Sequence, residues 1–272
     1  MEQEQLDGWR ESAGDSQRRW LDSSGFDARP GRWGALPDAD GGIAAVLFGT
    51  TQEGALGQLA NLATALPAGT YRLDADWNAE QRTLAALGWG LAQYRFERYR
   101  KQEAHPARLW LEDDIATEVN RLYDAQCLVR DLVNTPTEDM GPEELADALA
   151  EQAERFEARY TVITGEDLLA MDYPTIHTVG RAADRSPRLA CLEWGEPDAP
   201  LVALVGKGVC FDSGGLNIKP AGGMLLMKKD MGGAAHVIAL ARLVMEFELP
   251  VRLLVLVPAV ENAISGNAYR PG

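Results

Sequence analysis

The chain has 272 residues, 46% of them hydrophobic and 25% charged, which is typical of a globular protein with a substantial core. Its formal net charge of −15 argues against a nucleic-acid-binding surface, and no apolar run is long enough to span a bilayer. Three separated cysteines without a CxxC pair, and a start without an apolar secretory segment, predict a cytoplasmic protein with reduced thiols.

Residues 1–105 are predicted to form a small α/β domain, because strand-like and helix-like patterns alternate along them. Residues 1–40 carry weak signals. We expect a buried strand at 41–50, a helix at 54–66, a second strand at 69–74 and a long helix at 78–100 capped by Asn78.

A second domain is predicted at 129–272, after a polar, proline-broken boundary at 101–114 and a linking helix at 106–128. The helical pattern itself covers 114–134. Strands are expected at 159–165, 174–183, 188–195, 201–206 and 251–260, and helices at 135–156, 166–170 and 232–247. The fold class is therefore α/β, with a mixed, largely parallel sheet covered by helices.

The stretch "VGKGVCFDSGGLNIKPAGGMLLMKKDMGG" (205–233) holds eight glycines, four lysines and two aspartates. Lys207 directly follows a predicted strand, and Asp230 directly precedes a predicted helix. In open α/β sheets, binding sites gather beyond the carboxyl ends of strands, and glycine lets the backbone approach a ligand closely. Residues 201–272 carry seven Lys and Arg against five Asp and Glu, whereas the first 200 carry 19 against 36. The stretch is thus locally cationic within an acidic protein.

Two kinds of site fit such a loop. A phosphate-binding loop is disfavoured, because Leu201 stands where GxxxxGK[ST] needs its first glycine and Phe211 interrupts GxGxxG. A metal site held mostly by oxygen fits better, because Asp212 and Asp230 can converge on a divalent cation. The HExxH signature is absent. Lysines beside such a cation can lose their proton and ligate it, or stay charged and polarise a carbonyl.

The segments "VGKGVCFDSGGLNIKP", "MKKDMGGAA" and "ISGNAYRPG" together closely resemble the leucyl aminopeptidase family, the M17 cytosolic aminopeptidases. The resemblance runs from about Leu87 to Gly272. It implies a two-metal exopeptidase that removes leucine-like, apolar N-terminal residues from peptides, works best at mildly alkaline pH and assembles as a cytoplasmic homohexamer.

The resemblance also implies a role for each matching residue. Lys207, Asp212 and Asp230 would be metal ligands, with Asp212 bridging both ions, which are manganese, zinc or magnesium in the family. Lys219 would be catalytic and contact the substrate, and Met227 would help to line the pocket for the first side chain. Glu261 and Asn262 are expected to support the ligands from behind.

One departure concerns the end of the chain. The family's remaining metal carboxylates and its catalytic arginine lie in an NTDAEGR motif, which is expected after residue 272, so we expect the chain to be incomplete. Arg270 does not belong to that motif. An inactive fragment or regulatory subunit that keeps the fold is the first alternative. A DNA-binding role, as in some relatives, is the second, although the acidic surface opposes it.

Overall fold

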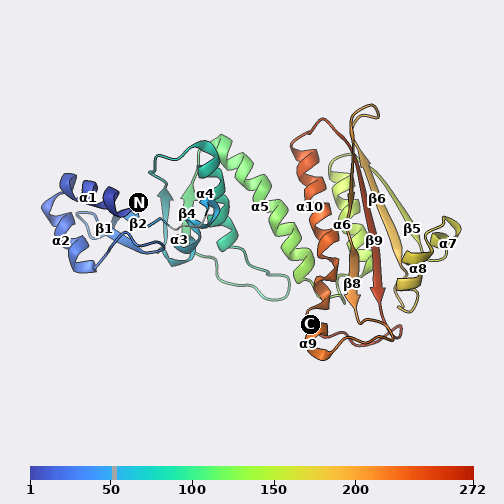
Figure 1. Cartoon of the computed structure of the whole chain (residues 1–272). Helices are drawn as coiled ribbons and strands as arrows, with labels where there is room; N and C mark the ends of the chain where they lie inside the picture. The colour runs from blue at the N-terminus through green and yellow to red at the C-terminus, as the bar shows by residue number, and fades with distance from the viewer. Residues whose placement is uncertain (51–53) are drawn as a thin grey trace. The chain divides into compact units, whose positions relative to one another are not determined.

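The computed structural model describes residues 1–50 and 54–272, which form two units (Figure 1). The first unit comprises Met1–Arg95 and Gln102–Tyr123, and the second comprises Phe96–Lys101 and Asp124–Gly272. The change of unit near residue 123 falls inside one long helix, α5 (Asp113–Asn134). None of the helices in the described part of the chain has both the length and the apolar composition that crossing a bilayer demands.

The first unit contains two small two-stranded sheets, one antiparallel (β1–β2) and one parallel (β3–β4). Asn78 caps α4, as predicted, and exchanges hydrogen bonds with Gln81. The elements are α1 (Gln3–Ser12), α2 (Asp15–Ser24), β1 (Trp33–Pro37), β2 (Ile43–Phe48), η1 (Ala55–Gly57), α3 (Ala60–Ala65), β3 (Gly69–Arg72), α4 (Ala79–Ala92) and β4 (Ala107–Trp110).

Three expectations for this unit were wrong. The strand at 41–50 is not buried, because residues 43–45 of β2 are exposed and residues 46–48 are only half-buried. The helix predicted to reach residue 100 ends at Ala92. Residues 106–112 do not begin the linking helix, because β4 pairs with β3 across its whole length. Long-range strand pairing of this kind overrides the polar local composition.

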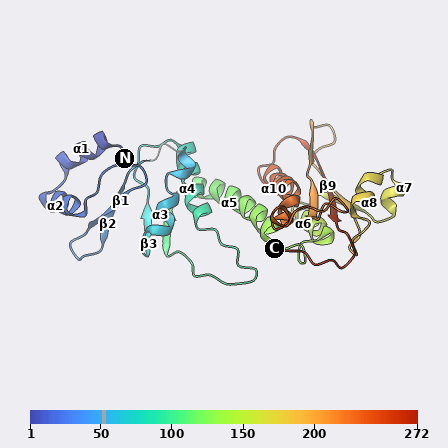
Figure 2. The same cartoon turned by 60° about the horizontal axis from the view of Figure 1, so that its bottom comes forward.

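The second unit is a mixed five-stranded sheet with helices on both sides (Figures 1 and 2), which confirms the predicted fold class. The long central strand β9 pairs antiparallel with β6 and parallel with β7 and β8, and β5 lies outside β6. The strands are β5 (Arg159–Thr164), β6 (Arg188–Trp194), β7 (Leu201–Val205), β8 (Gly208–Asp212) and β9 (Arg252–Asn262), and the helices are α6 (Pro142–Arg155), α7 (Asp167–Ala170), α8 (Pro174–Gly180), α9 (Ala221–Met224), η2 (Met227–Met231) and α10 (Gly232–Glu246).

The core of this unit lies between β9 and the helices α5, α6 and α10. Alternate residues of β9, namely Leu253, Val255, Val257 and Ala259, are fully buried and pack in one cluster with these helices. This period-two pattern explains why an apolar run became the central strand. The pairing of β8 with β9 places the carboxyl ends of these two strands side by side.

The segment at 174–183 was predicted as a strand and is the helix α8 instead. Pro174 occupies its first turn, where a missing N–H costs nothing. At its end, Gly180 packs tightly on Pro187 and Val260, so tertiary packing decides against the β propensity of this segment. Strand β8 was also missed, because the glycine-rich stretch was interpreted as a loop throughout.

Replacing Leu145 with alanine is expected to lower the free energy of unfolding by about 2–5 kcal/mol, because the side chain is fully buried on α6. Urea denaturation followed by circular dichroism measures this change. Leu169→Ala, at a residue that is 44% exposed on α7, is the matched control and should have little effect. Equal stabilities of the two variants would contradict the position of the core.

Candidate active site

Four predicted residues lie near the carboxyl ends of β7 and β8. Lys207 lies in the short link between these strands, Asp212 is the last residue of β8, and Asp230 lies in η2, just before α10. Lys207 Nζ is 2.7 Å from Asp230 Oδ2, and Lys219 Nζ is 2.9 Å from Asp212 Oδ2. Two lysine–aspartate pairs therefore form from segments that are separated by up to 23 residues.

The backbone around Lys207 is tightly fixed. Its carbonyl accepts a hydrogen bond from the N–H of Ala234, in the first turn of α10, at 3.0 Å. A Cβ at the preceding residue, Gly206, would lie 2.4 Å from a methyl of Val237 and 2.7 Å from Ala234 Cα. Glycine is therefore required at position 206 for the chain to approach the helix. This close approach brings Lys207 next to the first turn of α10.

Asp212 divides its hydrogen bonds between its two carboxylate oxygens. Oδ1 accepts from the N–H of Gly214 at 3.0 Å and from Nδ2 of Asn262 at 2.7 Å. Oδ2 faces Lys219. Backbone and amide donors thus hold one oxygen in place, and the other is directed to the centre of the site.

Asp212 and Lys219 each stabilise the charged form of the other. Burial raises the pKa of Asp212, but hydrogen bonds from Lys219, Asn262 and Gly214 outweigh it, so this pKa lies below its usual value. The pKa of Lys219 is raised, first by its hydrogen bond to Asp212 and then by the charges of Asp212 and Asp230. Both side chains are therefore charged at neutral pH.

The side chains of the site offer some, but not all, of the ligands that a divalent cation needs. Two carboxylates from separate segments are hard oxygen donors, and a lysine amine is a possible nitrogen ligand. Among residues 1–50 and 54–272, no three His, Cys, Asp or Glu side chains are grouped so that they could hold a metal ion. Within the chain, a cation at this place would therefore rely on Asp212, Asp230 and a lysine, with water or substrate completing its coordination.

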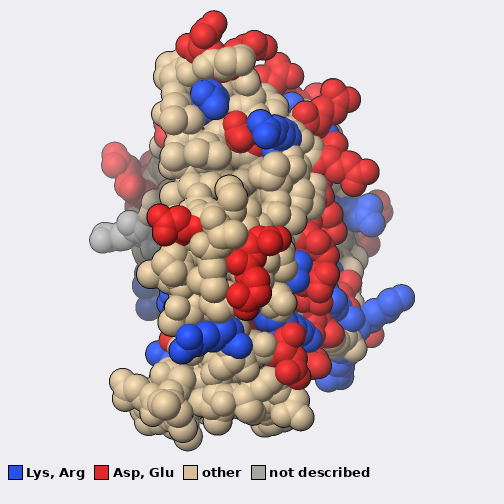
Figure 3. All heavy atoms as spheres, turned by 90° about the vertical axis from the view of Figure 1, so that its right-hand side faces the viewer, with Lys and Arg blue, Asp and Glu red and all other residues tan. Residues whose placement is uncertain are grey.

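The loop that carries Lys219 has an apolar surface. Leu216 is 98% exposed, Leu226 is 61% exposed, and Ile218 and Leu225 are exposed to a similar degree as Leu226. Figure 3 shows a lobe without charged side chains at the bottom of the molecule, where Figure 1 places the segments around α9 and after β9. Met227, the predicted pocket residue, is half-buried at the start of η2.

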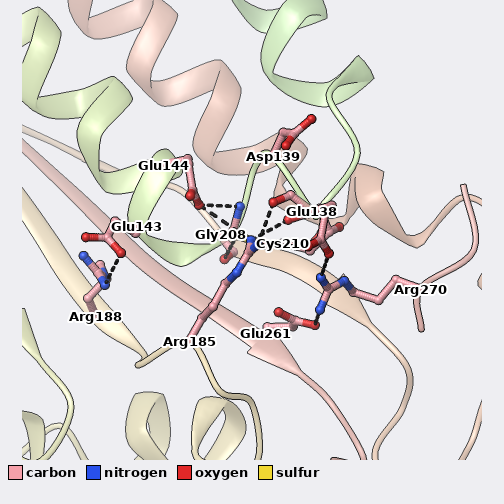
Figure 4. A network of polar contacts seen from close by, with 12 residues as sticks. Glu138, Asp139, Glu143, Glu144, Arg185, Arg188, Gly208, Cys210, Glu261 and Arg270 are labelled. Atoms are coloured by element: carbon pink, nitrogen blue, oxygen red, sulfur yellow. Dashed lines mark hydrogen bonds and ion pairs between the residues drawn. The ribbon is translucent and has the colours of Figure 1, made fainter. Parts of the chain in front are cut away.

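Glu261 and Asn262 were predicted to lie together behind the site, but the structure gives them separate roles. Asn262 contacts Asp212, whereas Glu261 is 2% exposed and pairs with Arg270, whose Nη1 lies 2.7 Å from its Oε1. Arg270 also contacts Glu138 (Figure 4). Adjacent residues on a strand point to opposite faces, and this alternation was the sequence signal that could have separated them.

The network in Figure 4 was not predicted. Arg185 donates to the carbonyls of Thr137 and Glu138 and lies near the carboxylate of Glu144, so it ties the start of α6 to the segment before β6. Cys210, at its centre, is 1% exposed, and burial raises the pKa of its thiol. It packs in the core of the second unit as a small apolar residue.

Family models match most of the chain. The model described as the cytosol aminopeptidase family, catalytic domain, matches residues 127–272, and the M17 aminopeptidase N-terminal domain matches residues 1–112. Peptidase B of Pectobacterium atrosepticum is 40% identical over 202 residues, which cover 70% of this chain and 46% of that protein. Peptidase B of Yersinia pseudotuberculosis is 39% identical over 206 residues. The chain spans about half the length of these curated relatives.

Solved structures agree with the family models. The cytosol aminopeptidase of Coxiella burnetii superposes with a TM-score of 0.92 at 44% identity, over 100% of this chain and 60% of that one. The bottromycin maturation enzyme BotP, solved in complex with Mn, superposes with a TM-score of 0.78 at 35% identity, over 95% of this chain and 59% of that one.

Proposed function

The chain belongs to the cytosol aminopeptidase (M17) family, and from that premise we propose that it supplies part of the active site of a metal-dependent aminopeptidase. The reaction is hydrolysis of the first peptide bond of a peptide. The convergence of Lys207, Asp212, Lys219 and Asp230 at one edge of the sheet is the observation that carries this proposal.

Lys207, Asp212 and Asp230 are the proposed ligands of two divalent cations, and Asp212 serves both. When bound, these ions supply Lewis acidity, which polarises the peptide carbonyl and makes water a stronger nucleophile. The solved complex of BotP with Mn supports manganese as the first ion to test, with zinc and magnesium as alternatives. The lowered pKa of Asp212 keeps this carboxylate charged at neutral pH, as binding a cation requires.

Lys219 is the proposed catalytic residue. Its ammonium lies 2.9 Å from Asp212 Oδ2, and its pKa is raised by the hydrogen bond and charge of Asp212 and by the charge of Asp230, so it is protonated at neutral pH. A protonated lysine can donate a hydrogen bond to the substrate carbonyl as negative charge develops on that oxygen. A donor of this kind contributes more to the transition state than to the bound substrate, which is the condition for a higher rate.

The proposed substrates are peptides that begin with leucine or another apolar residue. The exposed leucines and isoleucine around Lys219, together with Met227, offer an apolar surface beside the reacting groups. A homohexamer in the cytoplasm is the proposed assembly, on the strength of the family resemblance. Multi-angle light scattering would test this assembly, with a mass of six chains as the expected result and a monomer as the contradictory one.

Activity is expected to rise with pH through about 8, where the α-amino group of a peptide loses its proton. The Lys219 ammonium repels a protonated amine, whereas Asp212 is already ionised far below this pH because its pKa is lowered. The measurement is kcat/KM against pH for leucine p-nitroanilide. A profile that is flat between pH 6.5 and 9, the range bracketing the ordinary α-amino pKa, would contradict this assignment.

Replacing Lys207 with methionine is expected to weaken Mn²⁺ binding by at least about tenfold, the lower bound for groups that only support a ligand. Methionine keeps the length of the side chain and removes the amine. Isothermal titration calorimetry measures the affinity, and Lys229→Met, at an exposed lysine nearby, is the control. Equal affinities in both variants would exclude Lys207 as a ligand.

Turnover of leucine p-nitroanilide by the complete protein, with added Mn²⁺ or Zn²⁺, tests the proposed function as a whole. Metal-dependent hydrolysis that EDTA abolishes is the expected result. Bound metal without turnover would instead support an inactive or regulatory protein that keeps the fold. A salt-sensitive shift of DNA without any turnover would support the nucleic-acid alternative.

A further inference from the structure

We propose that Asn262 is a positioning residue for Asp212, and that a β-bulge at Cys210 places the two side by side. The proposal rests on the proposed function, because it concerns how the chain presents Asp212 to a cation. Asn262 is not offered as a ligand or as a group that touches substrate. Its role is to select which carboxylate oxygen of Asp212 faces the site.

The first step is the direction of the Asp212 carboxylate. Asn262 Nδ2 donates to Oδ1 at 2.7 Å, and the Gly214 N–H donates to the same oxygen at 3.0 Å. The group therefore cannot rotate without losing two hydrogen bonds. An amide is suited to this role, because it is neutral and donates without adding a positive charge that would compete with the cation for Asp212.

The second step is the register of the strands. Gly208 is paired with Ala259, so an unbroken parallel ladder would set Asp212 opposite Ala263. The ladder is instead shifted between Val209 and Phe211, and Asp212 is paired with Asn262. Cys210 is the extra residue of this bulge. Bulges redirect side chains next to active sites, and here the shift by one residue brings an amide beside the carboxylate.

The third step is the bulge itself, which Thr137 stabilises from a distant segment. The Thr137 hydroxyl donates to the carbonyl of Cys210 at 2.7 Å in a buried position. An unpaired buried carbonyl would be costly, so this hydrogen bond favours the bulged arrangement over a regular ladder. Thr137 directly precedes Glu138 in the sequence, and its own carbonyl accepts a hydrogen bond from Arg185 at 2.7 Å.

The fourth step is the anchoring of Asn262. Its carbonyl accepts from the N–H of Ser213 at 3.0 Å and from the Ser213 hydroxyl at 2.6 Å. The carbonyl of Ser213 in turn accepts from the N–H of Lys219 at 3.0 Å. The end of β9 is therefore tied to the loop that carries the catalytic lysine. On the opposite face, the buried Glu261–Arg270 pair holds the same strand end (Figure 4).

The test compares Asn262→Leu with Asn267→Leu in the whole chain. Leucine keeps the number and branching of the side-chain heavy atoms and removes the donor, and Asn267 is an exposed amide on the same segment. We expect Asn262→Leu to weaken Mn²⁺ binding about 10–100-fold by calorimetry, as for other residues that orient a ligand. The melting temperature should match that of the control, and Asn267→Leu should bind Mn²⁺ like the wild type.

A second readout does not depend on metal. Loss of the Asn262 donor frees the Asp212 carboxylate, so the Gly214 amide should exchange its hydrogen faster in Asn262→Leu, as followed by NMR. Thr137→Val, which removes the hydroxyl and keeps the shape, should increase exchange at the same amide. Wild-type exchange at Gly214 in both variants would overturn the proposal.

The outcomes separate this proposal from the proposed function. If the wild type binds no Mn²⁺ but Gly214 exchanges faster in Asn262→Leu, Asn262 positions Asp212 and the metal assignment fails. If the wild type binds Mn²⁺ and Asn262→Leu binds it equally well, the metal assignment survives and the positioning role fails.

Discussion

Replacing Asp212 with alanine in the complete protein is expected to abolish turnover of leucine p-nitroanilide. One oxygen of this carboxylate is held by Asn262 and Gly214, and the other faces Lys219 at the centre of the site. Because one residue would serve two cations, its loss should remove both the metal and the hydrogen-bond partner that raises the pKa of Lys219. The measurements are kcat/KM and the manganese content of the purified variant, and both should fall to background.

Asp198→Ala is the matched control for this prediction. Asp198 is an exposed aspartate in the turn between β6 and β7, away from the lysine–aspartate pairs. Its removal should leave both kcat/KM and manganese content unchanged. Activity near that of the wild type in Asp212→Ala would contradict the two-metal assignment, whatever the control shows.

Replacing Lys219 with alanine is expected to lower kcat by about 10²–10³-fold, the usual cost of removing one donor to a developing oxyanion. Manganese content should be retained, because the two carboxylates remain. Lys219→Arg keeps the charge but replaces a compact ammonium with a planar group, so it should have an intermediate rate. Steady-state kinetics and metal analysis on the same samples measure both quantities.

Measuring both kcat and manganese content distinguishes the role of Lys219 from that of Lys207. Loss of manganese in Lys219→Ala, with Lys207→Met retaining it, would mean that the two lysines have exchanged their roles. An unchanged kcat in Lys219→Ala would remove Lys219 from the reaction altogether. Lys229→Ala, at an exposed lysine, is the control, and it should leave both kcat and manganese content unchanged.

Elements with strong local patterns were predictable from the sequence. The central strand β9 has a near-continuous apolar run, and α6 has Pro142 in its first turn followed by two glutamates. The start of α4 followed from a capping asparagine. In each case the local signal agrees with the tertiary structure, so nothing overrides it.

Elements that depend on distant partners were not predictable. Strand β8 lies within the glycine-rich stretch, which has no strand-like pattern of its own. It forms because β9 pairs with it. Strand β4 exists because β3 pairs with it. Helix α8 contains β-branched residues, and packing at Gly180 decides its conformation. These are cases in which contacts remote in sequence outweigh local propensity.

In the candidate site, too, some features were predictable from the sequence and others depend on distant contacts. The grouping of Lys207, Asp212, Lys219 and Asp230 could be predicted, because their spacing matches a known motif and they flank strand and helix ends. The contact between Asn262 and Asp212 could not, because it needs a one-residue bulge at Cys210 that no local pattern announces. The pairing of Arg270 with Glu138 also joins segments that are 132 residues apart.

The most direct test of the central claim is the position of manganese in crystals of the protein soaked with Mn²⁺, located by its anomalous scattering. We expect a peak within about 2.5 Å of carboxylate oxygens of both Asp212 and Asp230, with Lys219 turned away from it. Ordered crystals that show manganese only at other carboxylates, with both lysine–aspartate pairs intact, would contradict it.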